Sequence, residues 1–240
     1  MTSINATEYE FAGLNELVHN AQDDVAIVNC CGQRFIAAGM KRGRVTIDGV
    51  PGNALGAYLT GGEIIVHGNA QDAVGDTMND GEIVISGNVG DAVGYAMRGG
   101  AIYVRGNAGY RAGIHMKEYK SKKPVIVIGG RCGSFLGEYQ AGGRLIVLGL
   151  HQDGRPSVGN FPCTGMHGGK LILRGDGSGV KFPVQTKVSE LTAEDWEEIA
   201  PYLHRFCEVF GVDYQALSQE RFCVVTPDSQ NPYKQMYVAN

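Results

Sequence analysis

Short aliphatic segments recur along the chain, and each of them ends just before a glycine. In the segments at 45–48, 64–67 and 83–86, every second side chain is aliphatic, which is the period of a β-strand. The glycines that follow the segments share one register: Gly49, Gly68, Gly87, Gly106, Gly130, Gly149 and Gly175. Four of the six spacings are 19 residues, and the other two are longer by 5 and 7 residues. The chain therefore repeats one short unit about seven times.

Each unit carries two further glycines at fixed positions. They follow the first glycine by seven residues and by thirteen residues: Gly56, Gly75, Gly94, Gly113 and Gly137, then Gly62, Gly81, Gly100 and Gly143. Glycine is favoured where the backbone needs a positive φ or a close approach, so three glycines in a unit predict three corners. Strands and corners repeating every ~19 residues predict an all-β solenoid, a parallel β-helix of about seven glycine-rich coils. A propeller is excluded because its blade needs about forty residues.

Two sets of positions in the repeat are predicted to lie inside the solenoid. Side chains alternate in direction along a strand, so the first and third positions of each strand point the same way. These fourteen positions are all aliphatic: Val45, Ile47, Ile64, Val66, Ile83, Ile85, Ile102, Val104, Ile126, Ile128, Leu145, Val147, Leu171 and Leu173. The second set lies ten residues after each glycine and is expected to fill the core: Leu59, Met78, Met97 and Met116. A third aligned set predicts a ladder of stacked amide side chains: Asn69, Asn88 and Asn107.

The middle position of each strand points outward, yet it is apolar in six of seven coils. The column consists of Thr46, Ile65, Val84, Tyr103, Val127, Ile146 and Ile172. A continuous apolar stripe is disfavoured in water, so this column must be covered. The sequence leaves two alternatives open, the C-terminal part of the same chain or another protein.

Both ends of the repeat change character, which predicts three regions. Residues 1–40 contain a helix-like stretch and a strand-like stretch, and we interpret them as an N-terminal cap. Residues 41–180 form the β-helix, and residues 181–240 form a helical segment and tail packed on it. In this last region Thr192 and Asp195 predict a capping box. Pro201 is expected to interrupt the helix and Gly211 to end it.

Composition limits the possible functions more than it suggests one. Of the 240 residues 36 are glycine, and the formal net charge is −4 with a pI near 5.9. No basic surplus favours nucleic acid or an anionic membrane as a partner, and a cytoplasmic location is expected. The six cysteines have no CxxC spacing, so no metal site is predicted and we interpret them as reduced, mostly buried thiols. We predict no catalytic residue and no cofactor-binding residue, because no hydrolase, P-loop or metalloprotease motif is present.

The fourth coil departs from the small residues found in its neighbours. Here Tyr, Arg and His side chains immediately precede the five-residue insertion, and Tyr and Arg are enriched in protein interfaces. Together with three residues of the outer column they are our candidates for a partner interface: Tyr110, Arg111, His115, Lys117, Glu118, Tyr119, Tyr103, Ile65 and Val84.

The repeat resembles the GXGXG domain that closes the large subunit of glutamate synthase. The similarity is carried by the run GGEIIVHGNAQDAVGDTMNDGEIVISGNVGDAVGYAMRGGAIYVRGNAGYRAG and by 137–149, where Gln140 stands in place of the usual Met. The same repeats occur in one of the subunits of formylmethanofuran dehydrogenase. The resemblance implies a right-handed β-helix that braces a glutamine amidotransferase against a synthase domain carrying FMN and an iron–sulfur cluster.

Three hypotheses follow for the function. The first is a non-catalytic scaffold subunit of a split glutamate synthase-type oxidoreductase, with a glutamine amidotransferase subunit and an FMN-dependent synthase subunit as partners. FMN and the iron–sulfur cluster are then expected on those partners and no cofactor on this chain. The second is the repeat-bearing subunit of a formylmethanofuran dehydrogenase. The third is a free-standing β-helix hydrolase, for which Asp72 and Asp91 occupy equivalent positions in adjacent coils.

Overall fold

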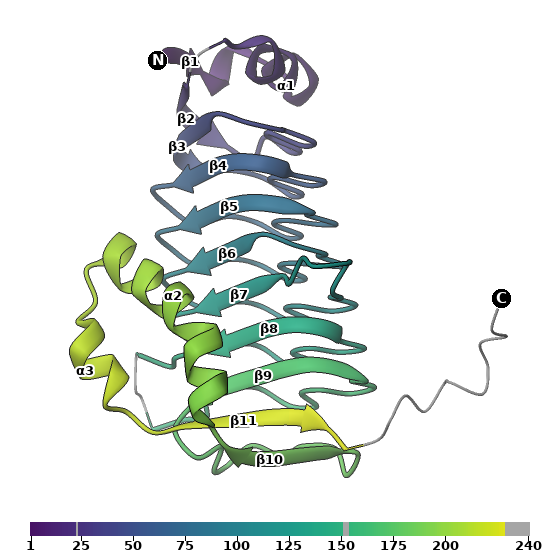
Figure 1. Cartoon of the computed structure of the whole chain (residues 1–240). Coiled ribbons are helices and arrows are strands. Elements are labelled where there is room, and N and C mark those ends of the chain that lie inside the picture. The colour runs from purple at the N-terminus through teal and green to yellow at the C-terminus, as the bar shows by residue number, and fades with distance from the viewer. Residues whose placement is uncertain (23, 151–153, 229–240) are drawn as a thin grey trace, which may run out of the picture.

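The chain forms one long sheet that winds into a solenoid. The computed structural model describes residues 1–22, 24–150 and 154–228. Over these residues eleven strands follow the order β1-β2-β3-β4-β5-β6-β7-β8-β9-β11-β10 (Figure 1). Their bounds are β1 Thr2–Asn5, β2 Val25–Cys31, β3 Arg44–Val50, β4 Thr60–Val66, β5 Asp80–Ile85, β6 Ala101–Val104, β7 Val125–Ile128, β8 Ala141–Val147, β9 Gly168–Arg174, β10 Thr186–Glu190 and β11 Phe222–Pro227. The helices are α1 Phe11–Asn20, α2 Ala193–Phe210 and α3 Tyr214–Ser218, with a short 3₁₀ turn at Ala6–Glu8.

Strands β1 to β9 are parallel neighbours in sequence order, which confirms the predicted parallel β-helix. Ile64 of β4 pairs with Val45 of β3 and with Ile83 of β5, as the 19-residue register requires. The insertion before β7 does not shift the register, because Ile102 still pairs with Ile126. Extra residues are therefore accommodated outside the strands.

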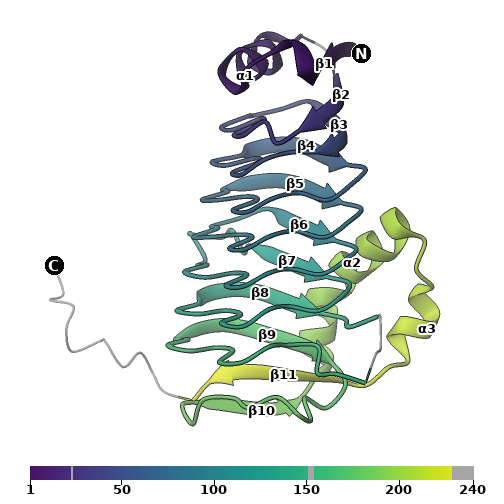
Figure 2. The same ribbon diagram turned by 180° about the vertical axis from the view of Figure 1, so that it is seen from behind.

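The N-terminal segment contributes strands to the same stack. β1 pairs in parallel with β2, and β2 pairs in parallel with β3, so Ile27 continues the column that contains Ile47. Helix α1 lies over this end of the solenoid (Figures 1 and 2). Its Leu14 and Val18 are buried in the core, which covers the apolar interior at the first coil.

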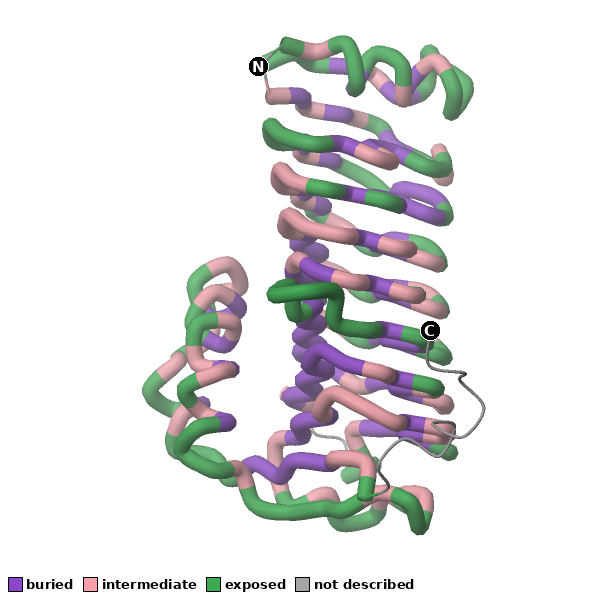
Figure 3. Tube along the Cα trace, turned by 45° about the vertical axis from the view of Figure 1, so that its right-hand side comes forward, coloured by how far each residue is buried: buried purple, intermediate pink, exposed green. Residues whose placement is uncertain are grey.

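The interior is a continuous column of aliphatic side chains. All fourteen predicted strand positions are buried, as are Leu59, Met78, Met97 and Met116, and the buried positions align from coil to coil (Figure 3). Gln140 continues the methionine column and is also fully buried. Its amide nitrogen donates to the carbonyl oxygens of Gly142 and Gly143.

The predicted asparagine ladder exists, but its bonds run from side chain to backbone. The Oδ1 atom of Asn69 accepts the backbone N–H of Asn88, and Oδ1 of Asn88 accepts that of Asn107, at 2.8 and 2.7 Å. A Cβ atom on Gly87 would overlap this Oδ1 of Asn69. Glycine therefore precedes Asn88 and Asn107 because the asparagine side chain from the coil before occupies the space of its Cβ.

The other end of the stack is closed by strands of reversed direction. β11 pairs antiparallel with β9, and β10 pairs antiparallel with β11. Between them α2 begins with the predicted capping box of Thr192 and Asp195 and ends at Gly211, which is left-handed with φ 66°. The expected interruption at Pro201 is wrong, because α2 continues through it. Packing of the buried α2 face on the sheet outweighs the one backbone bond that proline removes. The tail predicted beyond residue 228 lies outside the described residues.

Helix α2 covers the outer apolar column, so the cover belongs to the same chain. Ile199, Leu203 and Phe206 of α2 pack in one cluster with outward side chains of the sheet, and Figure 1 shows the helix lying across the strands. Most of the column is buried in this cluster: Val84, Tyr103, Val127, Ile146 and Ile172. Thr46 is half-buried, and Ile65 packs at the margin of the cluster. Helix α2 therefore packs on the outer face of the β-helix.

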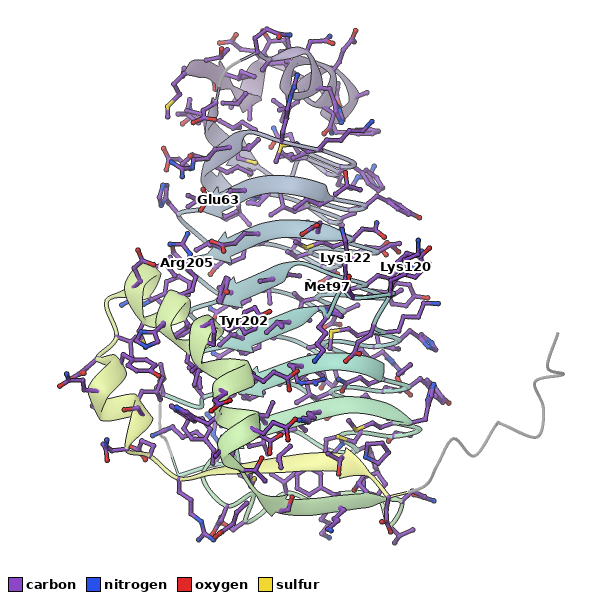
Figure 4. All side chains as sticks on the ribbon, viewed as in Figure 1. Glu63, Met97, Lys120, Lys122, Tyr202 and Arg205 are labelled. Atoms are coloured by element: carbon purple, nitrogen blue, oxygen red, sulfur yellow. The ribbon has the colours of Figure 1, made fainter. Side chains whose placement is uncertain are left out.

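Ion pairs fasten α2 to the strands beneath it. Arg144 of β8 is buried and donates to both carboxylate oxygens of Glu198 at 2.7 Å. Lys123 and Lys170 bind the same carboxylate. Burial alone would raise the pKa of Glu198, but the bonds from these three cations outweigh it and lower the pKa to about 2. At the other end of α2, Arg205 binds Glu63 and Glu82 (Figure 4).

Candidate interaction surface

The turn before each strand contains two positions where residues other than glycine adopt a positive φ. The turns lie at the edge of the solenoid away from α2 (Figures 1 and 2). The first position has φ between 56° and 63° in seven coils: Phe35, Ala54, Ala73, Ala92, Arg111, Phe135 and Phe161. The second has φ between 50° and 57° in five coils: Tyr58, Thr77, Ala96, His115 and Tyr139. Backbone bonds from each turn to the next hold both columns in register.

Alanine occupies four of these positions before residue 111, where only Phe35 and Tyr58 are large, whereas from Arg111 onward every residue at these positions is large. Alanine is present at four of them: Ala54, Ala73, Ala92 and Ala96. A positive φ disfavours any side chain with a Cβ, and bulky ones are rarer still. Since the fold accepts alanine here, Arg111, His115 and Phe135 are not needed to form the turn. Strained positions of this kind indicate a function of the side chain.

The large side chains of the later coils stack on one another. The guanidinium of Arg111 lies 5.0 Å from the ring centre of Phe135, which stacks on Phe161 at 5.3 Å. In the second column His115 stacks on Tyr139 at 5.2 Å with an interplanar angle of 10°. Tyr95 completes the set, since its ring meets His115 at 5.9 Å in a T-shaped contact. We call these residues the aromatic ladder: Tyr95, Arg111, His115, Phe135, Tyr139 and Phe161.

The aromatic ladder faces solvent although its rings are large. Phe161 is 62% exposed, Tyr95 41% and Tyr139 39%. Tyr110, next to Arg111, is 53% exposed. Exposed aromatic side chains gathered on one surface are typical of protein interfaces.

The five-residue insertion forms a tight turn beside the aromatic ladder. Tyr119 and Lys122 exchange two backbone hydrogen bonds of 3.1 and 3.0 Å, and Lys120 between them has φ 56°. The run from 117 to 123 is exposed (Figure 3). Lys120 and Lys122 lie on the side of the solenoid away from α2 (Figure 4). Lys122 binds Asp80 at 2.6 Å, which fixes the turn against an earlier coil.

The structure separates the predicted interface residues into two groups. One group is exposed on the turn edge and the insertion: Tyr110, Arg111, His115, Lys117 and Tyr119. Glu118 is on the insertion too, but its carboxylate accepts from Arg144 and from the backbone of Gly143. The other group belongs to the sheet face, where Val84 and Tyr103 are buried under α2 and Ile65 is half-buried. Burial raises the pKa of Tyr103. Neither Val84 nor Tyr103 is accessible to a partner while α2 is in place.

Sequence reasoning missed four members of this surface: Tyr95, Phe135, Tyr139 and Phe161. Their signal was present in the repeat, because Phe135 and Phe161 occupy the alanine position of earlier coils. The glycines that define the repeat do not mark these positions. Only the structure shows that alanine occupies two further turn positions.

The aligned carboxylates of Asp72 and Asp91 and the buried cysteines contribute to the structure of the solenoid. The carboxylates of Asp72 and Asp91 accept the backbone N–H groups of Asp91 and Tyr110, both at 2.8 Å, and so bridge successive coils. Burial raises the pKa of Cys30 to about 11 and those of Cys132 and Cys163 to about 12, which keeps these thiols protonated and weakly nucleophilic. All six cysteines are free and five are buried, as predicted. Over the described ranges no three potential ligands cluster to hold a metal ion.

Comparison with known proteins places the chain in a family. Among the residues that the structure describes, no helix combines the length and apolar character needed to cross a membrane. The chain is 42% identical over 248 aligned positions to an uncharacterized protein of Methanocaldococcus jannaschii, MJ1350, and the alignment covers 98% of this chain and 95% of that protein. The family model described as the GXGXG motif matches residues 13–228, which include the strands from β2 to β11. The chain belongs to the GXGXG motif family.

Proposed function

We propose that this chain is a non-catalytic scaffold subunit of a glutamate synthase-type oxidoreductase. The observation that carries the proposal is the GXGXG family match over residues 13–228. The partners would be a glutamine amidotransferase subunit and an FMN-dependent synthase subunit, and FMN and the iron–sulfur cluster would reside on the latter. The chain itself would bind no cofactor and act in the cytoplasm.

The internal use of polar groups supports a structural role. Backbone N–H groups of the next coil donate to side-chain oxygens of Asn69, Asn88 and Asp72. The ion pairs of Arg144 and Arg205 attach α2 to the sheet. The aromatic ladder is exposed to solvent, and its rings favour protein contacts.

Purification from the native host under gentle conditions tests the proposal. The chain is expected to elute together with an amidotransferase subunit and with a yellow, flavin-containing subunit whose absorbance follows the complex. Elution as a lone monomer would contradict the scaffold role. Elution with a molybdenum or tungsten protein would instead support the second hypothesis, a formylmethanofuran dehydrogenase.

The hydrolase hypothesis is the weakest of the three. A retaining glycosidase needs one carboxyl group that stays protonated and a second that is free to attack. One oxygen of Asp72 and one of Asp91 already accept backbone N–H groups of the next coil, so both carboxylates join coils in this fold. Glycoside hydrolysis that is lost in Asp72→Asn would overturn this assessment.

A further inference from the structure

Two cations lie next to each other beside the aromatic ladder without a carboxylate to pair them. Arg98 and Lys117 occupy equivalent positions in adjacent coils, since their backbone N–H groups bind the carbonyls of Met78 and Met97. Adjacent coils are ~4.8 Å apart. Neither cation forms an ion pair with a described carboxylate, and Nε of Arg98 is buried with no hydrogen-bond partner among the described residues. Unpaired like charges on adjacent coils repel each other, so an anion bound between them would remove this repulsion.

Further positive charge surrounds this pair. Lys120, at the tip of the insertion, has its ammonium over the ring of Tyr119 at 5.3 Å and pairs with no described carboxylate. Arg111 is exposed over half of its side chain, while its partner Glu138 is nearly buried. Arg111 is balanced by Glu138, but Arg98, Lys117 and Lys120 have no carboxylate partner among the described residues, so this part of the surface is positive although the chain as a whole has a net charge of −4.

The stacked rings favour the same kind of ligand. Because His115 and Tyr139 stack on each other, as do Phe135 and Phe161, one face of each ring is covered and the ring edges point away from the stack. The edge of an aromatic ring carries the positive part of its quadrupole. Ring edges and cations thus attract the same partner groups, carboxylates and carbonyl oxygens.

We propose that the aromatic ladder, together with Arg98, Lys117 and Lys120, is the docking surface for an acidic segment of a partner protein. This inference rests on the proposed scaffold role and specifies which face of the solenoid performs it. The acidic segment lies along the turn edge, its carboxylates pair with the three unpaired cations, and its apolar side chains contact the ring edges. The partner is thereby held at the edge opposite α2.

A protein fits this surface better than a single-stranded nucleic acid. Nucleic-acid platforms offer free ring faces for bases to stack on, with a positive groove along the backbone. Here four of the rings each have one face covered by a stacked neighbour, and the other face of Phe135 meets the guanidinium of Arg111. The unpaired cations are also few, whereas phosphate binding requires many.

Fluorescence anisotropy with a labelled oligoglutamate peptide that carries tyrosines tests the surface on the purified full-length chain. Binding is expected at low salt and should weaken steeply as salt is added. The double substitution Lys117→Glu and Lys120→Glu should weaken binding by at least about tenfold, and Phe135→Ala with Phe161→Ala should also weaken it. Lys187→Glu on β10, an exposed lysine elsewhere, is the matched control and should bind as the wild type. All variants lie on the surface, and circular dichroism verifies that each is folded.

The outcomes separate this surface from the scaffold role. A peptide that fails to bind the wild type, binds all variants equally, or is displaced by oligouridylate would overturn the docking surface. In the native host, loss of the complex in the Lys117→Glu and Lys120→Glu chain but not in Lys187→Glu supports the surface. A complex retained by both variants overturns the surface and leaves the scaffold role intact. If the wild type forms no complex, the scaffold role falls and the peptide experiment alone decides the surface.

Discussion

Large apolar side chains are buried on one flank of the solenoid, the sheet face, and exposed on the other, the turn edge. On the sheet face, Tyr103 and Val127 are buried beneath Phe206 of α2. On the turn edge, Phe161 and Tyr139 remain exposed with no element of the described chain over them. The first flank uses its apolar surface for the stability of the chain itself. The second retains an apolar surface that stability does not require, which is why we assign function to the turn edge.

The largest loss of stability is expected from a substitution on the sheet face. Phe206→Ala should lower the free energy of unfolding by about 3–5 kcal/mol, because it empties a fully buried site between α2 and the sheet. The ring lies so close to the backbone that a Cβ on Gly129 would meet its Cζ at 2.7 Å. Urea unfolding followed by circular dichroism measures the loss. Phe161→Ala is the matched control on the other flank, and an equal loss there would show that the two flanks do not differ.

The ion pairs under α2 give this flank a distinctive pH dependence. The pKa of Glu198 is about 2 in the folded protein, against an ordinary value of 4.5. The contribution of the ionised Glu198 to the free energy of unfolding is therefore complete above pH 4.5, and it is lost as the pH falls from 4.5 toward 2. Glu198→Gln should cost roughly 1.5–3 kcal/mol at neutral pH and flatten the decline in that window. Thermal melts at several pH values measure both effects, and parallel curves for wild type and variant would contradict this assignment.

A smaller effect is expected at the corner between the two flanks. Asn88→Ala removes the Oδ1 atom that accepts the N–H of Asn107 at 2.7 Å, and should cost about 1 kcal/mol. Asn88→Asp keeps the acceptor oxygen and should retain most of the stability. Equal losses in the two variants, measured by urea unfolding, would mean that the hydrogen bond is not what Asn88 contributes.

The smallest expected effect is on the turn edge. His115→Ala reproduces Ala96 of the preceding coil, and Arg111→Ala reproduces Ala92. Each should change the free energy of unfolding by no more than about 0.5 kcal/mol. Thermal melts of both variants check this, and a loss comparable with that of Phe206→Ala would mean that the aromatic ladder is structural after all.

Much of the fold could be predicted from the sequence because the same pattern of aliphatic positions and glycine recurs in seven coils. The period alone placed Ile64 and Ile83 in the core and fixed their pairing. The covering of Tyr103 by α2 was less accessible, because an amphipathic helix fits its own sheet and a partner's surface equally well by pattern alone. The interruption predicted at Pro201 is wrong because the tertiary packing of α2 outweighs the low helix propensity of one residue.

The candidate surface was only half visible in the sequence. Tyr110 and Arg111 stood out because their neighbours are small. Phe135 and Phe161 did not, because an isolated phenylalanine in a glycine-rich stretch is ordinarily assigned to the core. Their exposure depends on the left-handed backbone at their turn position, and nothing in the residue type alone indicates such a conformation.

The reversed direction of β11 makes the two ends of the molecule unequal in how they can change in length. A duplicated coil between β4 and β5 would meet a parallel neighbour on either side, as the existing coils do. Next to β11 it would instead have to reproduce the antiparallel pairing that β9 now makes. The solenoid can therefore lengthen most directly from within, in steps of ~4.8 Å. The number of coils thus sets the distance between α1 at one end of the solenoid and β11 near the other.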